Sequence, residues 1–65
     1  MEDYPKISLK AARVNAKMTQ REAAAEIGVN PTTLKRYEQG ATTPRADTLR
    51  KMAKVYGIED RYFDI

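Results

Sequence analysis

The side chains with the clearest chemical potential lie on one face of a predicted helix within residues 31–40. At about 100° per residue this face spans roughly 100°, and it presents hydroxyl, ammonium, guanidinium and carboxamide donors. The four residues are Thr32, Lys35, Arg36 and Gln39. Long donors of this kind read base edges in the DNA major groove, whereas an ordinary solvated helix face mixes Glu with Lys. We therefore expect this face to contact base pairs.

Two short helices with a tight turn between them are the elements that position this face. Glu22 follows Thr19 by three residues, which is the spacing of a capping box and predicts the start of a helix. Gly28 suits the left-handed position that ends a helix, and Asn30 with Pro31 supplies a cap and first turn for the next one. Two helices joined by a turn of about 3–4 residues form a helix-turn-helix, whose second helix enters the major groove.

Across this motif the chain resembles the phage repressor and Cro family, the lambda-type or XRE-like helix-turn-helix proteins. The matching positions in the motif are Thr19, Gln20, Glu22, Ala24, Ile27, Gly28, Val29, Tyr37, Glu38 and Gly40. Flanking positions at the family's spacings are Arg13, Pro44, Thr48, Leu49, Met52, Ala53, Gly57 and Ile58. The resemblance covers residues 9–63. It implies an all-α fold, namely a compact five-helix lambda-repressor-like DNA-binding domain with a helix-turn-helix.

Outside the motif, capping residues and helical spacing predict three further helices. These are expected at residues 9–17, 46–56 and 58–63. Residues 1–7 show no periodicity and are expected to form an extended N-terminal arm, followed by the DNA-binding domain in residues 8–65. A chain of 65 residues is short enough to form one domain with a thin core.

Positive charge is concentrated in the middle of the chain. The net charge is +3, from 12 basic and 9 acidic residues, and the pI is about 9.4. Five acids and one arginine lie near the ends, at Glu2, Asp3, Glu59, Asp60, Arg61 and Asp64. The other 11 basic and 4 acidic residues give the middle a charge of +7. Clustered basic charge favours a polyanionic partner.

The composition removes the usual catalytic and metal-binding groups. The chain has neither cysteine nor histidine, and Ser8 is its single serine. Glu22 and Glu26 are one turn apart, which is common on a solvated helix face. We therefore expect no enzyme, metal site, cofactor or small-molecule ligand. No apolar run approaches the roughly 18–20 residues of a membrane span and no signal segment is present, so a cytoplasmic protein without membrane contact is expected.

Five residues around the motif are expected to bind DNA phosphates. The free N–H groups and positive dipole end of the helix that begins near residue 19 favour an anion, although simple capping is the alternative. The expected contacts are Thr19, through its backbone, and Gln20, Asn30, Thr43 and Arg45. In the resembled family, the position of Arg45 carries either a capping serine or a basic residue that faces the DNA backbone.

Arg13 is the one charged residue on an otherwise apolar stripe of the first predicted helix. The resemblance implies that it pairs with Glu38, near the end of the recognition helix and on the side opposite the DNA-facing residues. The alternative is an exposed arginine that contributes almost nothing to stability. A pair removed from water would serve geometry, because the loss of one partner costs roughly 3–5 kcal/mol.

Apolar residues near the C-terminal end form a candidate contact with a second copy of the chain. They are Tyr56, Ile58, Tyr62 and Ile65. The family more often has polar residues around Tyr62, so this patch indicates a weak homodimer that is completed on DNA. Partial packing within the same molecule is the alternative.

These observations predict a sequence-specific double-stranded DNA-binding transcriptional regulator. A small phage or bacterial repressor or Cro-like protein that occludes a promoter fits them best. The alternative is a protein-interaction module, such as an antitoxin with secondary DNA binding.

Overall fold

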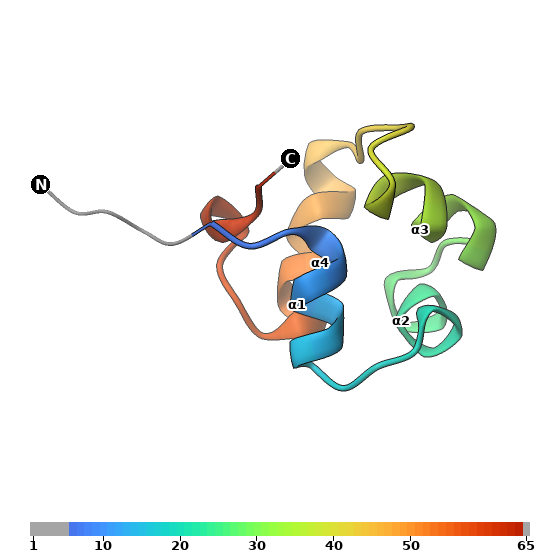
Figure 1. Ribbon diagram of the computed structural model, residues 1–65, viewed down its shortest axis with the longest axis horizontal. Helices are drawn as coiled ribbons and strands as arrows, with labels where there is room; N and C mark the ends of the chain where they lie inside the picture. Colours follow the sequence, from blue (N-terminus) through green and yellow to red (C-terminus); the bar gives the residue numbers. More distant parts are fainter. Residues whose placement is uncertain (1–5, 65) are drawn as a thin grey trace, which may run out of the picture.

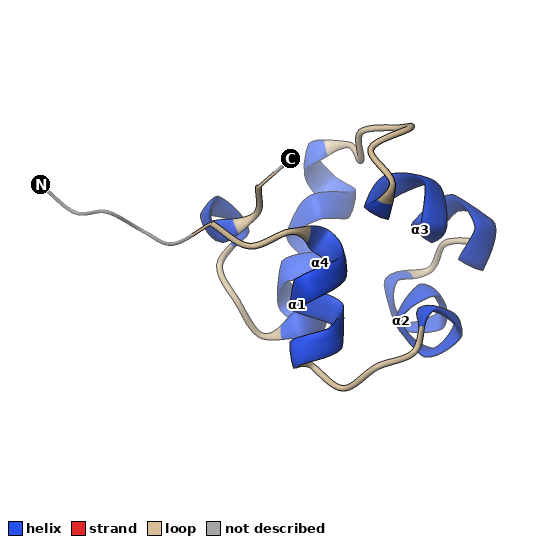
Figure 2. Cartoon of the chain, in the orientation of Figure 1, coloured by secondary structure: helices blue, strands red, loops and turns tan. Residues whose placement is uncertain are grey.

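Four α-helices and one short 3-10 helix form the regular elements of the computed structural model, which describes residues 6–64 (Figure 2). The α-helices are α1 (Leu9–Asn15), α2 (Gln20–Ile27), α3 (Pro31–Glu38) and α4 (Ala46–Tyr56), and the 3-10 helix is η1 (Asp60–Tyr62). Residues 1–5 of the expected arm and Ile65 of the expected contact patch lie outside the described residues. Residues 6–64 contain no membrane-spanning helix, since the longest helix has 11 residues.

Side-chain caps fix where three of the helices begin. The Ser8 hydroxyl accepts a hydrogen bond from the Ala11 N–H at 3.0 Å, and the predicted capping box of α2 is present. At α3, the Asn30 carboxamide oxygen accepts from the Thr32 N–H at 2.8 Å, next to a proline that requires no such partner. Arg45 precedes α4 without any side-chain cap.

Gly28 ends α2 in the left-handed conformation, with φ of 89°. Its N–H donates to the Ala24 carbonyl at 2.8 Å, and the Val29 N–H donates to the same oxygen at 3.0 Å. Any Cβ at this position would be strained by the positive φ and would stand 3.4 Å from the Lys51 ammonium nitrogen. The turn between α2 and α3 therefore depends on glycine.

The first helix is shorter than its spacing predicted. It ends at Asn15, and Lys17 takes a left-handed conformation with φ of 60°. The Lys17 N–H donates to the Val14 carbonyl at 2.9 Å, and the Met18 N–H donates to the Arg13 carbonyl at 3.3 Å. The left-handed residue ends the helix, and the chain continues from it directly to the Thr19 cap of α2.

The prediction of a fifth α-helix at residues 58–63 was wrong. One 3-10 turn occupies this segment, with the Phe63 N–H donating to the Asp60 carbonyl at 3.2 Å. The following residues pair with Ile7: its N–H donates to the Tyr62 carbonyl, and the Asp64 N–H donates to its carbonyl, both at 2.8 Å. The left-handed glycine before this segment and the backbone pairing after it leave room for a single turn.

The core lies between α4 and the other three α-helices. In Figure 1, α1 and α4 are central, with α2 and α3 on one side of them and η1 on the other. The buried hydrophobic residues are Leu9, Ala12, Ala23, Ala24, Ile27, Leu34, Met52, Ala53, Tyr56 and Phe63. Four of them are alanines, and three of these lie in α1 and α2, where each buries less apolar area than a larger side chain would. The larger side chains of α4 and the C-terminal segment fill the space, with the Tyr56 and Phe63 rings edge to face at 6.4 Å.

Candidate nucleic-acid interface

Helix α3 carries the expected base-reading residues on its solvent side. Thr32, Lys35, Arg36 and Gln39 are all exposed. Leu34, on the opposite side, has no exposed surface and anchors the helix in the core. The structure therefore brings the four donors together on the exposed side of α3, a helix that lies at the periphery of the molecule in Figure 1.

Asn30 is exposed at the N-terminal end of this face. Its carboxamide oxygen is occupied by the Thr32 N–H, so the group is fixed with its NH₂ available to an outside acceptor. The next residue is Pro31, whose fixed φ suits the first position of α3 and whose side chain carries no hydrogen-bonding group.

The loop that follows α3 places two further expected contacts at the surface. Thr43 and Arg45 are exposed, whereas Pro44 between them is buried. A buried proline restricts the backbone of this short loop and holds its neighbours on the outer side. Arg45 also directly precedes α4, where its guanidinium carries only donors and makes no capping bond to the free N–H groups of the helix.

At the start of α2, the capping box changes what Thr19 can offer. Its N–H donates to Glu22 Oε1 at 2.9 Å, and its hydroxyl oxygen accepts from the Glu22 N–H at 3.0 Å. The expected phosphate contact through the Thr19 backbone would therefore have to displace a carboxylate. Only the hydroxyl hydrogen of Thr19 remains for an anion.

Gln20 is half-buried and is bound within the protein. Its Nε2 donates to Glu38 Oε1 at 2.9 Å, which joins the first residue of α2 to the last residue of α3. Nothing in the sequence indicated this bond, because the two residues are 18 positions apart in the chain and no helical repeat relates them. One amide hydrogen of Gln20 remains for another acceptor.

The Arg13–Glu38 ion pair lies beneath this contact. Arg13 Nε is 2.7 Å from Glu38 Oε2, and Arg13 Nη2 donates to Glu38 Oε1 at 3.2 Å, which makes the pair bidentate. Arg13 Nη1 donates to the Met18 carbonyl at 2.9 Å. The side chains of Arg13 and Glu38 are only 10% and 3% exposed. Hydrogen bonding to Glu38 raises the pKa of Arg13 above its ordinary value, against the opposing effect of burial.

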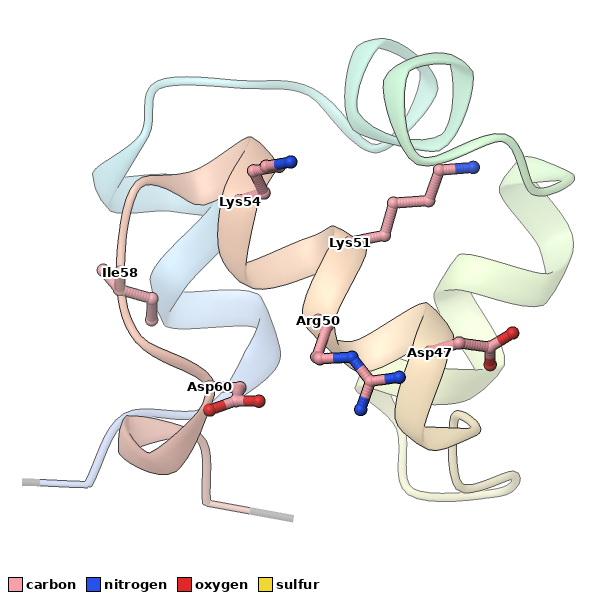
Figure 3. A pocket seen from close by; sticks show the side chains of 6 residues that line it. All are labelled: Asp47, Arg50, Lys51, Lys54, Ile58 and Asp60. Carbon is pink, nitrogen blue, oxygen red and sulfur yellow. The ribbon is translucent and has the colours of Figure 1, made fainter.

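A second basic surface lies on α4, around a shallow groove (Figure 3). Its lining residues are Asp47, Arg50, Lys51, Lys54, Ile58 and Asp60. Three cations and two carboxylates leave this groove with a net charge of +1. The expected base-reading and phosphate-binding residues include Lys35, Arg36 and Arg45 but no carboxylate. The side of α3 is therefore the stronger candidate for a polyanion.

The residues of the expected contact patch differ in how far they are exposed. Ile58 and Tyr62 are half-buried and line an apolar hollow together with Lys6 and Ile7. Tyr56 is only 7% exposed, so only a small edge of its side chain can contact a second copy. No sequence pattern indicated that Lys6 and Ile7 belong here, because their placement results from backbone pairing between distant segments.

Comparisons with known proteins agree with this geometry. A family model described as helix-turn-helix matches residues 9–63. The chain is 38% identical over 50 residues to the cryptic phage CTXphi transcriptional repressor RstR of Vibrio cholerae, covering 77% of this chain and 45% of that protein. It is 37% identical over 54 residues to the HTH-type transcriptional regulator ImmR of Bacillus subtilis (strain 168), covering 83% and 42%. The matched regions span less than half the length of either relative. No solved structure matches the chain.

Proposed function

Since the chain belongs to the helix-turn-helix family, we propose that it is a sequence-specific double-stranded DNA-binding transcriptional regulator. The observation that carries the proposal is the outer face of α3, where four exposed donors lie opposite a fully buried leucine. Both relatives are named as transcriptional regulators, and one of them as a phage repressor. We infer a repressor or Cro-like protein of the cytoplasm that occludes a promoter, an action that requires DNA binding but no catalytic group or cofactor.

Base readout is assigned to the α3 face. Lys35 and Arg36 reach into the major groove, where a bidentate guanidinium or an ammonium suits the O6 and N7 acceptors of guanine. Thr32 contacts a thymine methyl group or a base edge, and Gln39 lies at the margin. All four side chains are exposed, which supports this assignment.

Phosphate contacts surround that face and set the register of the protein on DNA. Asn30, Thr43 and Arg45 are exposed and keep free donors, and Gln20 keeps one amide hydrogen. Thr19 contributes at most its hydroxyl hydrogen, since its N–H is taken by Glu22. Contacts of this type carry affinity and salt dependence, while the base contacts carry sequence preference.

Two copies are proposed to bind a pseudo-palindrome. One recognition helix with about four reading side chains specifies only a few base pairs, too few to stand out among roughly 10⁶ or more competing sites. Two symmetric copies double the readout, with half-sites about 34–36 Å apart. Ile58 and Tyr62, with the edge of Tyr56 and with Ile65, are the proposed contact. Because this patch is small, we expect a weak dimer that DNA completes.

Selection of bound sequences from a pool of random duplex DNA, at stated salt, tests the function directly. A specific regulator should enrich one motif with two related halves, and native mass measurement should find two chains per selected duplex. Binding without any enriched motif would contradict sequence-specific recognition. One chain per palindrome would contradict the dimer and leave the DNA-binding assignment intact.

A further inference from the structure

We propose that Glu38 is a positioning residue for DNA binding, which fixes the amide of Gln20 so that α2 presents a preorganised donor to the DNA backbone. The proposal rests on the DNA-binding function proposed above. It concerns how a phosphate contact is built, and it assigns a role in that contact to a carboxylate that carries the wrong charge to touch DNA itself.

The hydrogen bond to Glu38 sets the orientation of the Gln20 amide. Gln20 Nε2 donates to Glu38 Oε1 at 2.9 Å. An ionised carboxylate only accepts hydrogen bonds, so the amide of Gln20 must turn its nitrogen, and never its oxygen, toward Glu38. This contact removes the flipped orientation of the amide and leaves one defined hydrogen on the nitrogen.

Glu38 is itself held in place by Arg13. Its two oxygens receive Arg13 Nε and Nη2 at 2.7 and 3.2 Å, in a side chain that is only 3% exposed. Arg13 is fixed in turn by the Met18 carbonyl at 2.9 Å. A residue of α1, the segment before α2 and the last residue of α3 are thereby tied together behind Gln20.

The bond to Glu38 also lowers the conformational entropy that Gln20 loses when it binds DNA. A glutamine at a helix surface samples several rotamers and loses this freedom when it binds a phosphate. A long side chain that becomes immobilised only when DNA binds weakens affinity by a factor of about 2 to 10, compared with a side chain that is already ordered in the free protein. Because Gln20 is half-buried and bonded in the free protein, that loss has already occurred on folding.

The negative charge of Glu38 is balanced by Arg13. Glu38 lies close to the surface that we assign to DNA, yet its carboxylate is neutralised by the bidentate contact with Arg13. The network therefore orients Gln20 with a strong acceptor without adding net negative charge behind the phosphate-binding residues.

A double-mutant cycle on the full chain tests the coupling. The background that removes the network is Arg13→Met with Glu38→Leu, since apolar replacement of both partners of a buried pair keeps a domain folded, whereas loss of one partner leaves an unpaired charge. Gln20→Ala is then made in the natural chain and in this background. Thermal unfolding of all four proteins establishes that each is folded at the assay temperature.

Affinity is measured for one duplex of fixed random sequence at low salt, because backbone contacts do not depend on sequence. In the natural chain Gln20→Ala should weaken binding by roughly tenfold. In the background without the network, the same substitution should have an effect smaller by a factor of about 2 to 10. Arg45→Ala is the matched control, because it removes a proposed phosphate contact outside the network and should have equal effects in both backgrounds.

A second readout needs no DNA. The two side-chain amide protons of Gln20 should give separate, dispersed NMR signals in the natural chain, and these should move to the values of a free glutamine when the pair is replaced. Equal effects of Gln20→Ala in both backgrounds would overturn the proposal even if Arg45→Ala weakens binding, in which case the DNA-binding function stands. If neither Gln20→Ala nor Arg45→Ala changes affinity, the proposed DNA surface itself is wrong.

Discussion

Replacement of Tyr56 by phenylalanine is expected to stabilise the protein. Tyr56 is 7% exposed, and its hydroxyl is buried with no hydrogen-bond partner among the residues that the structure describes. The aromatic ring is well used, since it packs edge to face on Phe63 at 6.4 Å with an interplanar angle of 81°. Phenylalanine keeps this ring contact and removes only the unpaired oxygen.

The size of the effect follows from the cost of burying a polar group without a partner, about 1–3 kcal/mol. Part of this gain is offset by the small void that the oxygen leaves. We therefore expect Tyr56→Phe to raise the free energy of unfolding by about 1 kcal/mol. For a domain of this size, that corresponds to a rise of roughly 4–8 °C in Tm.

The difference between the two proteins should widen at alkaline pH. Burial, reinforced by the charge of Glu38 and opposed by that of Arg13, raises the pKa of Tyr56 from 10.0 to about 12. Between these values the unfolded chain releases the phenolic proton and the folded chain keeps it, so the stability of the natural chain falls as pH rises above 10. The phenylalanine variant lacks this contribution, which amounts to at most about 1.4 kcal/mol per pH unit.

Urea unfolding of both proteins, from neutral pH to about pH 11, measures both effects. The partly exposed Tyr37, changed to phenylalanine, is the matched control and should shift stability less in each condition. If Tyr56→Phe lowers the free energy of unfolding at neutral pH by about 1 kcal/mol or more, the Tyr56 hydroxyl makes a stabilising hydrogen bond in solution and its assignment as unpaired is wrong. A stability difference that stays constant up to alkaline pH would refute the raised pKa.

Four further substitutions test the interface and its framework. Arg36→Ala should weaken binding to a selected duplex by about 1–3 kcal/mol and relax preference at one base pair, whereas equal weakening on random DNA would reassign Arg36 to the phosphates. Arg45→Ala should reduce the slope of log affinity against log salt by about 0.9, and an unchanged slope would exclude its phosphate contact. Arg13→Ala leaves the Glu38 carboxylate buried without its cation and should lower the free energy of unfolding by roughly 3–5 kcal/mol in urea titrations, so a loss below 1 kcal/mol would show that the pair is solvated. Lys17→Gly relieves a left-handed φ of 60° and should raise Tm by a few degrees, corresponding to about 0.5–1 kcal/mol. An unchanged or lower Tm would show that this backbone conformation costs the folded protein little.

The helix-turn-helix could be predicted from the sequence because its boundaries are set locally. Thr19 with Glu22, and Asn30 with Pro31, satisfy their own helix ends within three residues, so their spacing carries the structural information. The family predicted from this motif is confirmed by the match over residues 9–63. The face of α3 followed from the helical repeat, since a buried Leu34 requires an exposed opposite side.

Features that depend on distant segments were not predictable in this way. The last helix was assigned over residues 58–63 because its residues allow a helix, whereas pairing with Ile7 limits the segment to one 3-10 turn. The bond between Gln20 and Glu38 similarly joins two positions whose proximity exists only after α2 and α3 pack. The capping box was predicted, but its consequence for the Thr19 N–H was not, since one donor was assigned to two acceptors.

The backbone pairing of Ile7 with residues 62–64 makes the described chain nearly a closed ring. Both ends of this ring lie beside η1, while α2 and α3 lie toward the other end of the molecule in Figure 1. A circular permutant that joins the paired ends through a short linker, and opens the ring in the exposed loop between residues 41 and 42, ahead of the proposed contact at Thr43, keeps every helix and both partners of each cap. The permutant therefore moves the two chain ends from beside η1 to the loop that follows α3. A reporter group or a second binding module attached to these new ends would lie next to the proposed DNA surface.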